Sequence, residues 1–343
     1  MNWILALVIP GSALLGLLGT LAIERVSAGT SLVRAPDERS SHTVPTPRGG
    51  GLAIVVVALL ACVTCGVLGQ PVAWALAGLV AVTAALGFLD DLLDLSPLLR
   101  LGVQTMVLLA LIWLCGALPP IPLIADGVIG GWVLIALVLL AGLWWINLFN
   151  FMDGIDGIAA TQAIILLVAG SILSLGGMQT AMAPVFWLAW CSAAATAGFL
   201  LRNWAPARIF MGDVGSNALA LIVFALALTS LATGLAGYPA WIILVSVSVS
   251  DTTVTLLRRL AQGKRPWKAH RSHGYQQLSR LRGHQATTLL FAGMTLLWAL
   301  PLAWLAQAAP QAGWWLVLLA YAPLCGVMLW CGAGSAIERG KLG

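Results

Sequence analysis

The sequence predicts an all-α membrane protein that crosses a bilayer many times. Of its 343 residues, 60% are hydrophobic and only 8% are charged, and the mean hydropathy is +0.98. A soluble domain needs far more polar surface than this to stay dispersed. Apolar runs also recur along the whole chain, and each is close to the roughly 20 residues that a spanning helix needs.

These runs predict about eleven transmembrane helices. In order, they cover residues 2–23, 50–69, 72–89, 99–118, 128–146, 158–176, 184–201, 214–234, 237–257, 287–308 and 312–334. The chain has no tandem repeat and no separate soluble segment, so residues 1–343 are expected to form one integral membrane domain. The first run is followed, not preceded, by its charges Glu24 and Arg25, which favours an uncleaved helix over a signal peptide.

All basic residues fall on one predicted side. When the chain changes sides at each run, its 17 Lys and Arg and four His share one face, and Asp126 is the only charge opposite. The positive-inside rule makes the basic face cytoplasmic. An odd number of spans then places the N-terminus in the periplasm and the C-terminus in the cytoplasm. The net charge of +5 would attract phosphorylated lipids or nucleotides to this face. Nucleic acid is not an expected partner, because topology alone accounts for the basic residues.

Polar residues gather in the cytoplasmic loops 24–49, 90–98, 147–157, 202–213 and 258–286. In the second of these, Asp90 and Asp94 are four residues apart and share a helix face, with Asp91 about 100° round the axis. Carboxylates this close repel one another unless a cation or a basic group joins them. The alternative interpretation is an ordinary charged helix end.

Amide and carboxylate side chains recur at every third position in the next loop, as Asn147, Asn150, Asp153 and Asp156. Such oxygens are the ligands that Mg²⁺ prefers. Further along, Gly212 and Asp213 precede the eighth run. Glycine allows close backbone approach there, and a helix N-terminus attracts negative charge. Asp213 can hold a metal at this point, although an acid at a helix start is commonly only a cap.

Two basic segments complete the pattern. Arg48 follows a rigid Pro-x-Pro and leads into a triple-glycine turn, which suits an anion. The loop from Arg258 carries His270, Arg271 and His273 and is too long for a simple turn. Each segment also fits a solvated basic loop that only obeys topology. Acids suit Mg²⁺ and basic groups suit phosphates, so a nucleotide diphosphate and a lipid phosphate are a natural substrate pair.

Four stretches stand out as motifs: HTVPTPRGGGLAI at 42–54, GFLDDLLDLSP at 87–97, NLFNFMDGIDGIA at 147–159 and GDVGSNALA at 212–220. Together they resemble the polyprenyl-phosphate N-acetylhexosamine-1-phosphate transferases, most closely the bacterial enzymes that initiate O-antigen. The resemblance covers essentially the whole chain. It implies transfer of a sugar 1-phosphate from a UDP-sugar to undecaprenyl phosphate, with release of UMP, at the cytoplasmic face of the bacterial inner membrane.

The resemblance also implies a cofactor, partners and residue roles. Mg²⁺ is the expected cofactor, with Mn²⁺ as a substitute. The expected partners are undecaprenyl phosphate, the UDP-sugar and the bilayer, and a homodimer is left open. The implied roles are catalysis by Asp90, Asp91 and Asp153, metal binding by Asn150 and Asp213, and nucleotide-sugar or phosphate binding by Arg48, Asn147, Asp156, Gly212, His270, Arg271 and His273. Of the acids, Asp90 is expected to remove a proton from the lipid phosphate.

One motif departs from the family pattern. Relatives that use UDP-GlcNAc typically carry His-x-His-His where this chain has Tyr275 and Gln276 after His273. Two imidazoles that could contact the diphosphate or the sugar are therefore replaced. The expected donor is UDP-GlcNAc or a 6-deoxy analogue such as UDP-FucNAc or UDP-QuiNAc. Such a donor would start the synthesis of lipid-linked O-antigen, and so of lipopolysaccharide.

Three alternatives fit parts of the pattern. A transporter or flippase of a lipid-linked sugar would also use acids, but transporters usually place their polar sites near the midplane. A phospho-MurNAc-pentapeptide transferase is a related enzyme, yet its run of adjacent histidines is absent. A CDP-alcohol phosphotransferase would carry paired acids, whereas the acids here are spread over three distant loops.

Overall fold

The structure is a computed structural model that describes residues 2–27, 33–34, 46–122, 127–175, 179, 182–264 and 270–335. Several residues of the sequence analysis lie outside these ranges. They are residues 37–45 of the segment before Arg48, Asp126, residues 265–269 of the basic loop, and the C-terminal residues 336–343.

The described chain is mainly helical, which confirms the all-α class. Its helices are α1 (Asn2–Ser27), α2 (Gly51–Val67), α3 (Val72–Leu93), α4 (Pro97–Cys115), α5 (Gly131–Met152), α6 (Ile158–Leu173), α7 (Ala183–Asn203), α8 (Asp213–Ala232), α9 (Tyr238–Leu244), α10 (Ser246–Ala261), α11 (Gly274–Met294), η2 (Thr295–Ala299), α12 (Leu300–Ala308), η3 (Pro310–Ala312) and α13 (Gly313–Trp330). Two short antiparallel strand pairs accompany them: β1 (Val33–Arg34) with β2 (Thr46–Pro47), and β3 (Ile121–Pro122) with β4 (Val128–Ile129).

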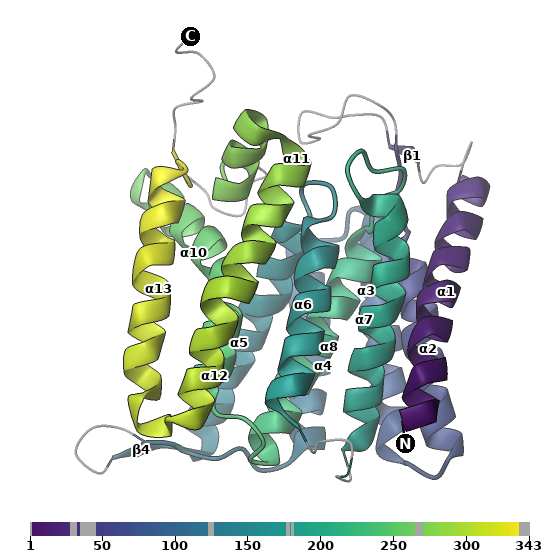
Figure 1. Cartoon of the computed structure of the whole chain (residues 1–343), viewed down its shortest axis with the longest axis horizontal. Coiled ribbons are helices and arrows are strands. Elements are labelled where there is room, and N and C mark those ends of the chain that lie inside the picture. Colours follow the sequence, from purple (N-terminus) through teal and green to yellow (C-terminus); the bar gives the residue numbers. More distant parts are fainter. Residues whose placement is uncertain are drawn as a thin grey trace.

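The helices form an upright bundle that is compatible with a membrane (Figure 1). Among the described residues, eight helices are long and apolar enough to cross a bilayer, and a bent pair would make a ninth. Two shorter apolar helices, α2 and α6, stand beside them. The chain is therefore a polytopic membrane protein. The number of eleven spans and the sidedness of the termini remain predictions.

Helix α8 forms the centre of the bundle. It packs against α2, α3, α5, α6 and α7, and 94% of its apolar window is buried, against 17% for α1. Its residues are mostly small or aliphatic, from Ala218 to Leu231, so neighbouring helices approach it closely. Asp213 is its first residue. The central helix thus delivers this acid to one end of the bundle, among the loops of its neighbours.

The predicted span 237–257 is broken. Helices α9 and α10 meet at Val245 with a bend of 69°. Beyond the bend, α10 carries a run of Ser, Asp and Thr residues, and such groups are costly in an apolar environment unless they find polar partners. The prediction of one continuous helix here was wrong. The apolar residues of α9 end at Leu244, and the polar residues of α10 follow in a helix of another direction.

A candidate active site at one end of the bundle

Backbone hydrogen bonds join the Arg48 segment to the start of α8. The amide of Phe210 donates to the carbonyl of Pro47 at 2.9 Å, and the amides of Gly50 and Gly51 donate to the carbonyls of Phe210 and Met211 at 3.0 and 2.9 Å. Segments that are distant in sequence therefore lie side by side. Arg48 is held close to Asp213 as a result.

Glycines allow the surrounding backbones to come together. A Cβ on Gly51 would collide with the Cα of Gly215, so the backbones of α2 and α8 can approach this closely only because both residues are glycine. Gly212 has a φ of +76°, and a Cβ there would lie 2.7 Å from Oδ2 of Asp91. The close approach at Gly212 is made by an acid at the end of α3, and the predicted role of Gly212 in binding phosphate stays a prediction.

A polar cavity of about 270 Å³ opens at this end of the bundle. Its lining consists of Arg48, Asp90, Asp91, Asp94, Leu95, Arg100 and Asp213. The structure thus brings the first acid cluster, the Arg48 segment and the start of α8 into one site. Arg100 was not singled out in the sequence. The sequence did contain a clue to it: Arg100 is a single cation near the start of an apolar run, shortly after three acids.

Asp90 is buried and held on both carboxylate oxygens. Nη1 of Arg100 donates to its Oδ2 at 2.5 Å, and the amide of Leu95 donates to its Oδ1 at 2.9 Å. Asp94 ends α3 in a left-handed conformation, with φ of 48°. The backbone therefore reverses at this point and folds back over the carboxylate of Asp90.

Asp213 is the meeting point of the acids. Its carboxyl group lies close to the side chains of Asn150 and Asp90, and Nδ2 of Asn150 donates to Oγ of Ser216 at 3.2 Å. Two carboxyl groups this close need a shared proton or a bridging cation. Asn150 and Asp213, the residues expected to bind metal, therefore lie together with Asp90.

The donor set matches the chemistry of a hard cation. Within the described ranges, no three His, Cys, Asp or Glu side chains form a ready-made metal site. Mg²⁺ is usually held by one or two carboxylates, with water and substrate phosphates completing its coordination. The carboxylate of Asp213 and the amide oxygen of Asn150 fit that mode of binding.

Asp153 follows the last residue of α5 and faces the same acids. Burial raises the pKa of this carboxyl well above its ordinary value, and Asp213 and Asp91 raise it further, while Arg48 opposes the shift. A carboxyl group with a raised pKa is suited to accept a proton near neutral pH. The site therefore contains two kinds of acid, one held by a cation and one destabilised in its ionised form.

Asp156 and Asn147 lie outside the lining of the acid cavity. Oδ2 of Asp156 is 3.2 Å from Nδ1 of His284 and accepts from the amide of Ala207 at 3.1 Å. It faces a second cavity, of about 540 Å³, that is also lined by Arg282. Asn147, one turn before Asn150, donates to Oε1 of Gln104 at 2.9 Å. His284 was not singled out in the sequence.

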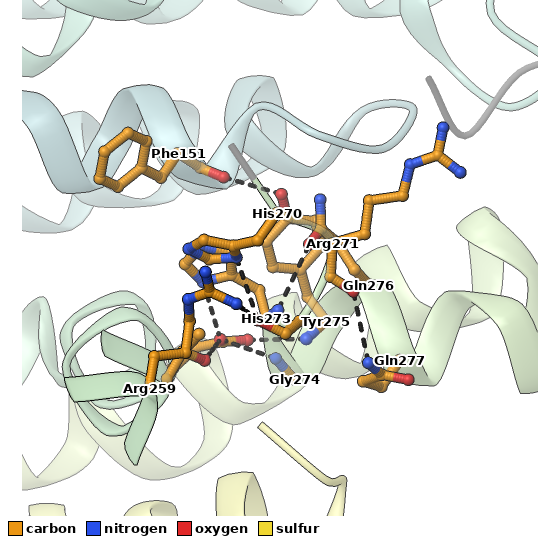
Figure 2. A network of polar contacts seen from close by, with 12 residues as sticks. Phe151, Arg259, His270, Arg271, His273, Gly274, Tyr275, Gln276 and Gln277 are labelled. Carbon is orange, nitrogen blue, oxygen red and sulfur yellow. Dashed lines mark hydrogen bonds and ion pairs between the residues drawn. The ribbon is translucent and has the colours of Figure 1, made fainter. Parts of the chain in front are cut away.

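The predicted histidines form a stack beside the end of α5. The rings of His270 and His273 are stacked at 4.9 Å, and the ring of His273 lies 6.2 Å from that of Phe151 (Figure 2). His273 is only 3% exposed. The side chain of Arg271 extends away from the stack (Figure 2). None of these groups is part of the lining of the acid cavity.

Asp251 of α10 holds this stack and was missed by the sequence analysis. Its oxygens accept from the amides of Gly274 and Tyr275 at 2.9 and 2.7 Å, and its Oδ1 is 3.4 Å from Nδ1 of His273. The signal was a single acid inside an apolar run, which is costly without a function. The bend before α10 brings this acid to the N-terminus of α11.

Tyr275 and Gln276 take up roles different from those expected of the histidines that they replace. Tyr275 is fully buried, and its hydroxyl donates to the carbonyl of Phe151 at 2.7 Å. Oε1 of Gln276 accepts from the amide of His273 at 3.3 Å. Both side chains therefore hold the protein together. The expectation that this position contacts the diphosphate or the sugar does not apply to Tyr275.

Comparisons with known proteins place these residues in a wider context. Residues 73–231 match the model of glycosyl transferase family 4. A probable undecaprenyl-phosphate N-acetylglucosaminyl 1-phosphate transferase of Bacillus subtilis is 30% identical over 78% of this chain and 75% of its own length. A decaprenyl-phosphate N-acetylglucosaminephosphotransferase of Mycolicibacterium smegmatis is 29% identical over 75% and 71%. A phospho-N-acetylmuramoyl-pentapeptide-transferase of Corynebacterium kroppenstedtii is 30% identical over 65% and 74%.

Proposed function

Because the chain belongs to glycosyl transferase family 4, we propose that it transfers an N-acetylhexosamine 1-phosphate from a UDP-sugar to undecaprenyl phosphate. The observation that carries this proposal is the single cavity shared by Asp90, Asp91, Asp213, Arg48 and Arg100. Acids and cations at one end of a membrane bundle suit a lipid phosphate and a soluble diphosphate that meet at the bilayer surface. An oxygen of the lipid phosphate forms a bond to the sugar-linked phosphorus, and the bond from that phosphorus to UMP breaks.

The two arginines of the cavity are proposed to bind phosphate groups. Arg48 lines the cavity together with the acids. The side chain of Arg100 is 35% exposed although it pairs with Asp90. Arginine binds phosphate through planar, paired hydrogen bonds. These cations would orient the lipid phosphate and the diphosphate toward each other.

Asp213 and Asn150 are proposed to hold Mg²⁺, with Mn²⁺ as a substitute. When bound, this ion would supply charge neutralisation for the diphosphate and the departing UMP. Asp213 is fixed for this role by its place at the first residue of α8. Asn150 of α5 is fixed by its hydrogen bond to Ser216, which lies one turn after Asp213 on α8.

Asp153 is the better candidate to accept a proton from the lipid phosphate. Both oxygens of Asp90 already accept hydrogen bonds from Arg100 and Leu95, which leaves that carboxylate little room to act on a substrate. Asp153 has a raised pKa, and only the monoanion of the lipid phosphate, with a pKa near about 6, needs to lose a proton. We therefore assign Asp90 to orientation and Asp153 to proton transfer.

The donor sugar and pathway extend this proposal. The relatives named above as N-acetylglucosaminyl transferases favour UDP-GlcNAc, and the His-x-His-His departure favours a 6-deoxy analogue. Because Tyr275 is buried, it makes no contact with the sugar that would distinguish between these two donors. The resemblance to O-antigen-initiating enzymes supports a role in lipopolysaccharide synthesis in the inner membrane, with the site facing the cytoplasm.

Purified protein tests the proposal. With Mg²⁺, undecaprenyl phosphate and a panel of UDP-GlcNAc, UDP-FucNAc, UDP-QuiNAc and UDP-MurNAc-pentapeptide, we expect UMP release and a labelled lipid product from one donor. Asp213→Asn and Asp153→Asn should reduce turnover by about a hundredfold or more. Glu24→Gln is the control, because Glu24 pairs with Arg202 outside the cavity lining. An absence of UMP release with every donor, or full activity in both variants, would overturn the proposal.

A further inference from the structure

Tyr275 lies against the turn that carries Asp153, and we propose that it is a positioning residue for that turn. The inference rests on the proposed function, because its consequence is the placement of Asp153 beside Asp213. Tyr275 itself faces no substrate: its side chain is 0% exposed. Any effect on the reaction must therefore pass through the residues that it holds.

The hydroxyl of Tyr275 binds both sides of the turn. Helix α5 ends at Met152, and the last carbonyls of a helix have no partner within the helix. The hydroxyl donates to one of them, that of Phe151, at 2.7 Å. The backbone of Gly154 hydrogen-bonds the same hydroxyl. Asp153 is thus the residue between two backbone groups that converge on one side-chain atom. Figure 2 shows the contact of this hydroxyl with the carbonyl of Phe151.

The position of that hydroxyl is itself fixed by α10. The amide of Tyr275 donates to Oδ2 of Asp251 at 2.7 Å, and the amide of Gly274 donates to its Oδ1 at 2.9 Å. The ring packs edge-on against Phe291, with centroids 6.4 Å apart. Tyr275 is therefore held at its backbone and along its ring, so its hydroxyl can serve as a fixed point for the turn.

Gly154 completes the contact. A Cβ at this position would overlap the hydroxyl of Tyr275 and would come within 3.1 Å of its Cζ. The turn can approach the tyrosine only because residue 154 has no side chain. Gly154 and Tyr275 thus form a matched pair, in which the hydroxyl fills the space that the glycine leaves.

The chain offers two matched controls for removing this hydroxyl. It has three tyrosines, and the other two also donate to backbone carbonyls: Tyr238 to Pro119 at 2.8 Å and Tyr321 to Ile242 at 3.0 Å. Tyr238→Phe and Tyr321→Phe therefore remove the same kind of bond from other parts of the bundle.

We expect Tyr275→Phe to lower kcat by about tenfold to a hundredfold, the effect of a small misplacement of a reacting group. The KM for the UDP-sugar should change by less than about twofold, because no substrate contact is lost. The two control variants should keep kcat within about twofold, and the Tm of all three variants in detergent is measured to confirm that each is folded. A kcat for Tyr275→Phe equal to that of the controls would overturn the inference. Wild-type protein that releases no UMP would instead overturn the proposed function, and this role with it.

A double-mutant cycle tests the pairing directly. Gly154→Ala should lower kcat strongly in the wild-type background, because the new methyl group meets the hydroxyl. In the Tyr275→Phe background the overlap with the hydroxyl is gone and the 3.1 Å contact with Cζ remains, so Gly154→Ala should cost at least about tenfold less. Equal costs in the two backgrounds would show that the hydroxyl does not set the turn, since independent sites give additive effects.

Discussion

Nη1 of Arg100 lies 2.5 Å from Oδ2 of Asp90, across the turn that joins α3 to α4. This pair ties two consecutive helices together at the mouth of the acid cavity. The positive charge of Arg100 also offsets the repulsion between the carboxylate of Asp90, which is 7% exposed, and that of Asp213.

Arg100→Gln should therefore destabilise the protein as well as reduce turnover. The buried carboxylate of Asp90 would lose its charged partner, at a cost of about 1–3 kcal/mol. Arg202→Gln is a matched control, because it breaks an ion pair with Glu24 without touching the cavity. Thermal unfolding and UMP release should be measured for both. If Arg100→Gln and Arg202→Gln lose the same stability and the same activity, Arg100 has no special role at the site.

Binding of Mg²⁺ should release protons, because a cation favours the ionised form of Asp153. The raised pKa of this carboxyl means that it binds a proton at pH values well above the roughly 3.9 of an unfolded Asp. Affinity for the metal should rise with pH through the raised pKa. Calorimetry in two buffers of different ionisation enthalpy gives the number of protons released. Asp153→Asn should reduce this release, and Glu24→Gln should leave it unchanged.

The same pKa predicts how pH changes the stability of the metal-free protein. Between the unfolded and the raised folded pKa of Asp153, the folded state binds more protons than the unfolded state. Stability should therefore fall as pH rises through that window. Asp153→Asn should flatten the dependence of Tm on pH, and a variant with an unchanged slope would contradict the raised pKa.

Gly51→Ala should weaken the contact between α2 and α8. The added methyl group would collide with the backbone of Gly215, and overpacking of this kind costs about 1–3 kcal/mol. Activity should fall as well, since the contact keeps Arg48 near Asp213. Gly78→Ala in α3 is the control, because a Cβ there meets nothing within 4 Å. Similar Tm values for both variants would argue against the close approach.

Asp251→Asn should disorder the start of α11. An amide has one acceptor oxygen, whereas the carboxylate of Asp251 accepts from the amides of Gly274 and Tyr275 on two. Loss of one buried bond costs about 1–3 kcal/mol, and hydrogen exchange at residues 273–276 should accelerate. Thr252→Val, next to it in α10 and also buried, is the control. Unchanged exchange in Asp251→Asn would contradict the anchoring role.

Cysteine labelling tests the predicted sidedness. Cysteines introduced at positions 48, 94 and 205 should react with a membrane-impermeant reagent only from the cytoplasmic side, and a cysteine at position 126 only from the outside. The native cysteines provide the background, which is measured in the unmodified protein. Labelling of position 48 from the periplasmic side would reverse the topology.

Much of this molecule was predictable from its sequence, because long apolar runs allow few structures other than helices in a membrane. The acids were predictable as a group for a related reason. Polar side chains such as Asp90, Asn150 and Asp213 at helix ends need partners, and the structure provides them in one another.

What was not predictable depends on contacts between distant segments. The bend at Val245 follows an apolar run without Pro or Gly at the break, so nothing local marked it. The burial of Tyr275 depends on the carbonyl of Phe151, 124 positions away. The pairing of Asp156 with His284 likewise joins loops whose spacing in the chain has no relation to their distance in space.

The junction between residues 47–51 and 210–211 is made by main-chain amides and carbonyls. Such bonds use main-chain atoms alone, so side-chain substitutions at Pro47 or Phe210 leave the donors and acceptors of the junction in place. The separation between Arg48 and Asp213 is therefore set by the course of the backbone.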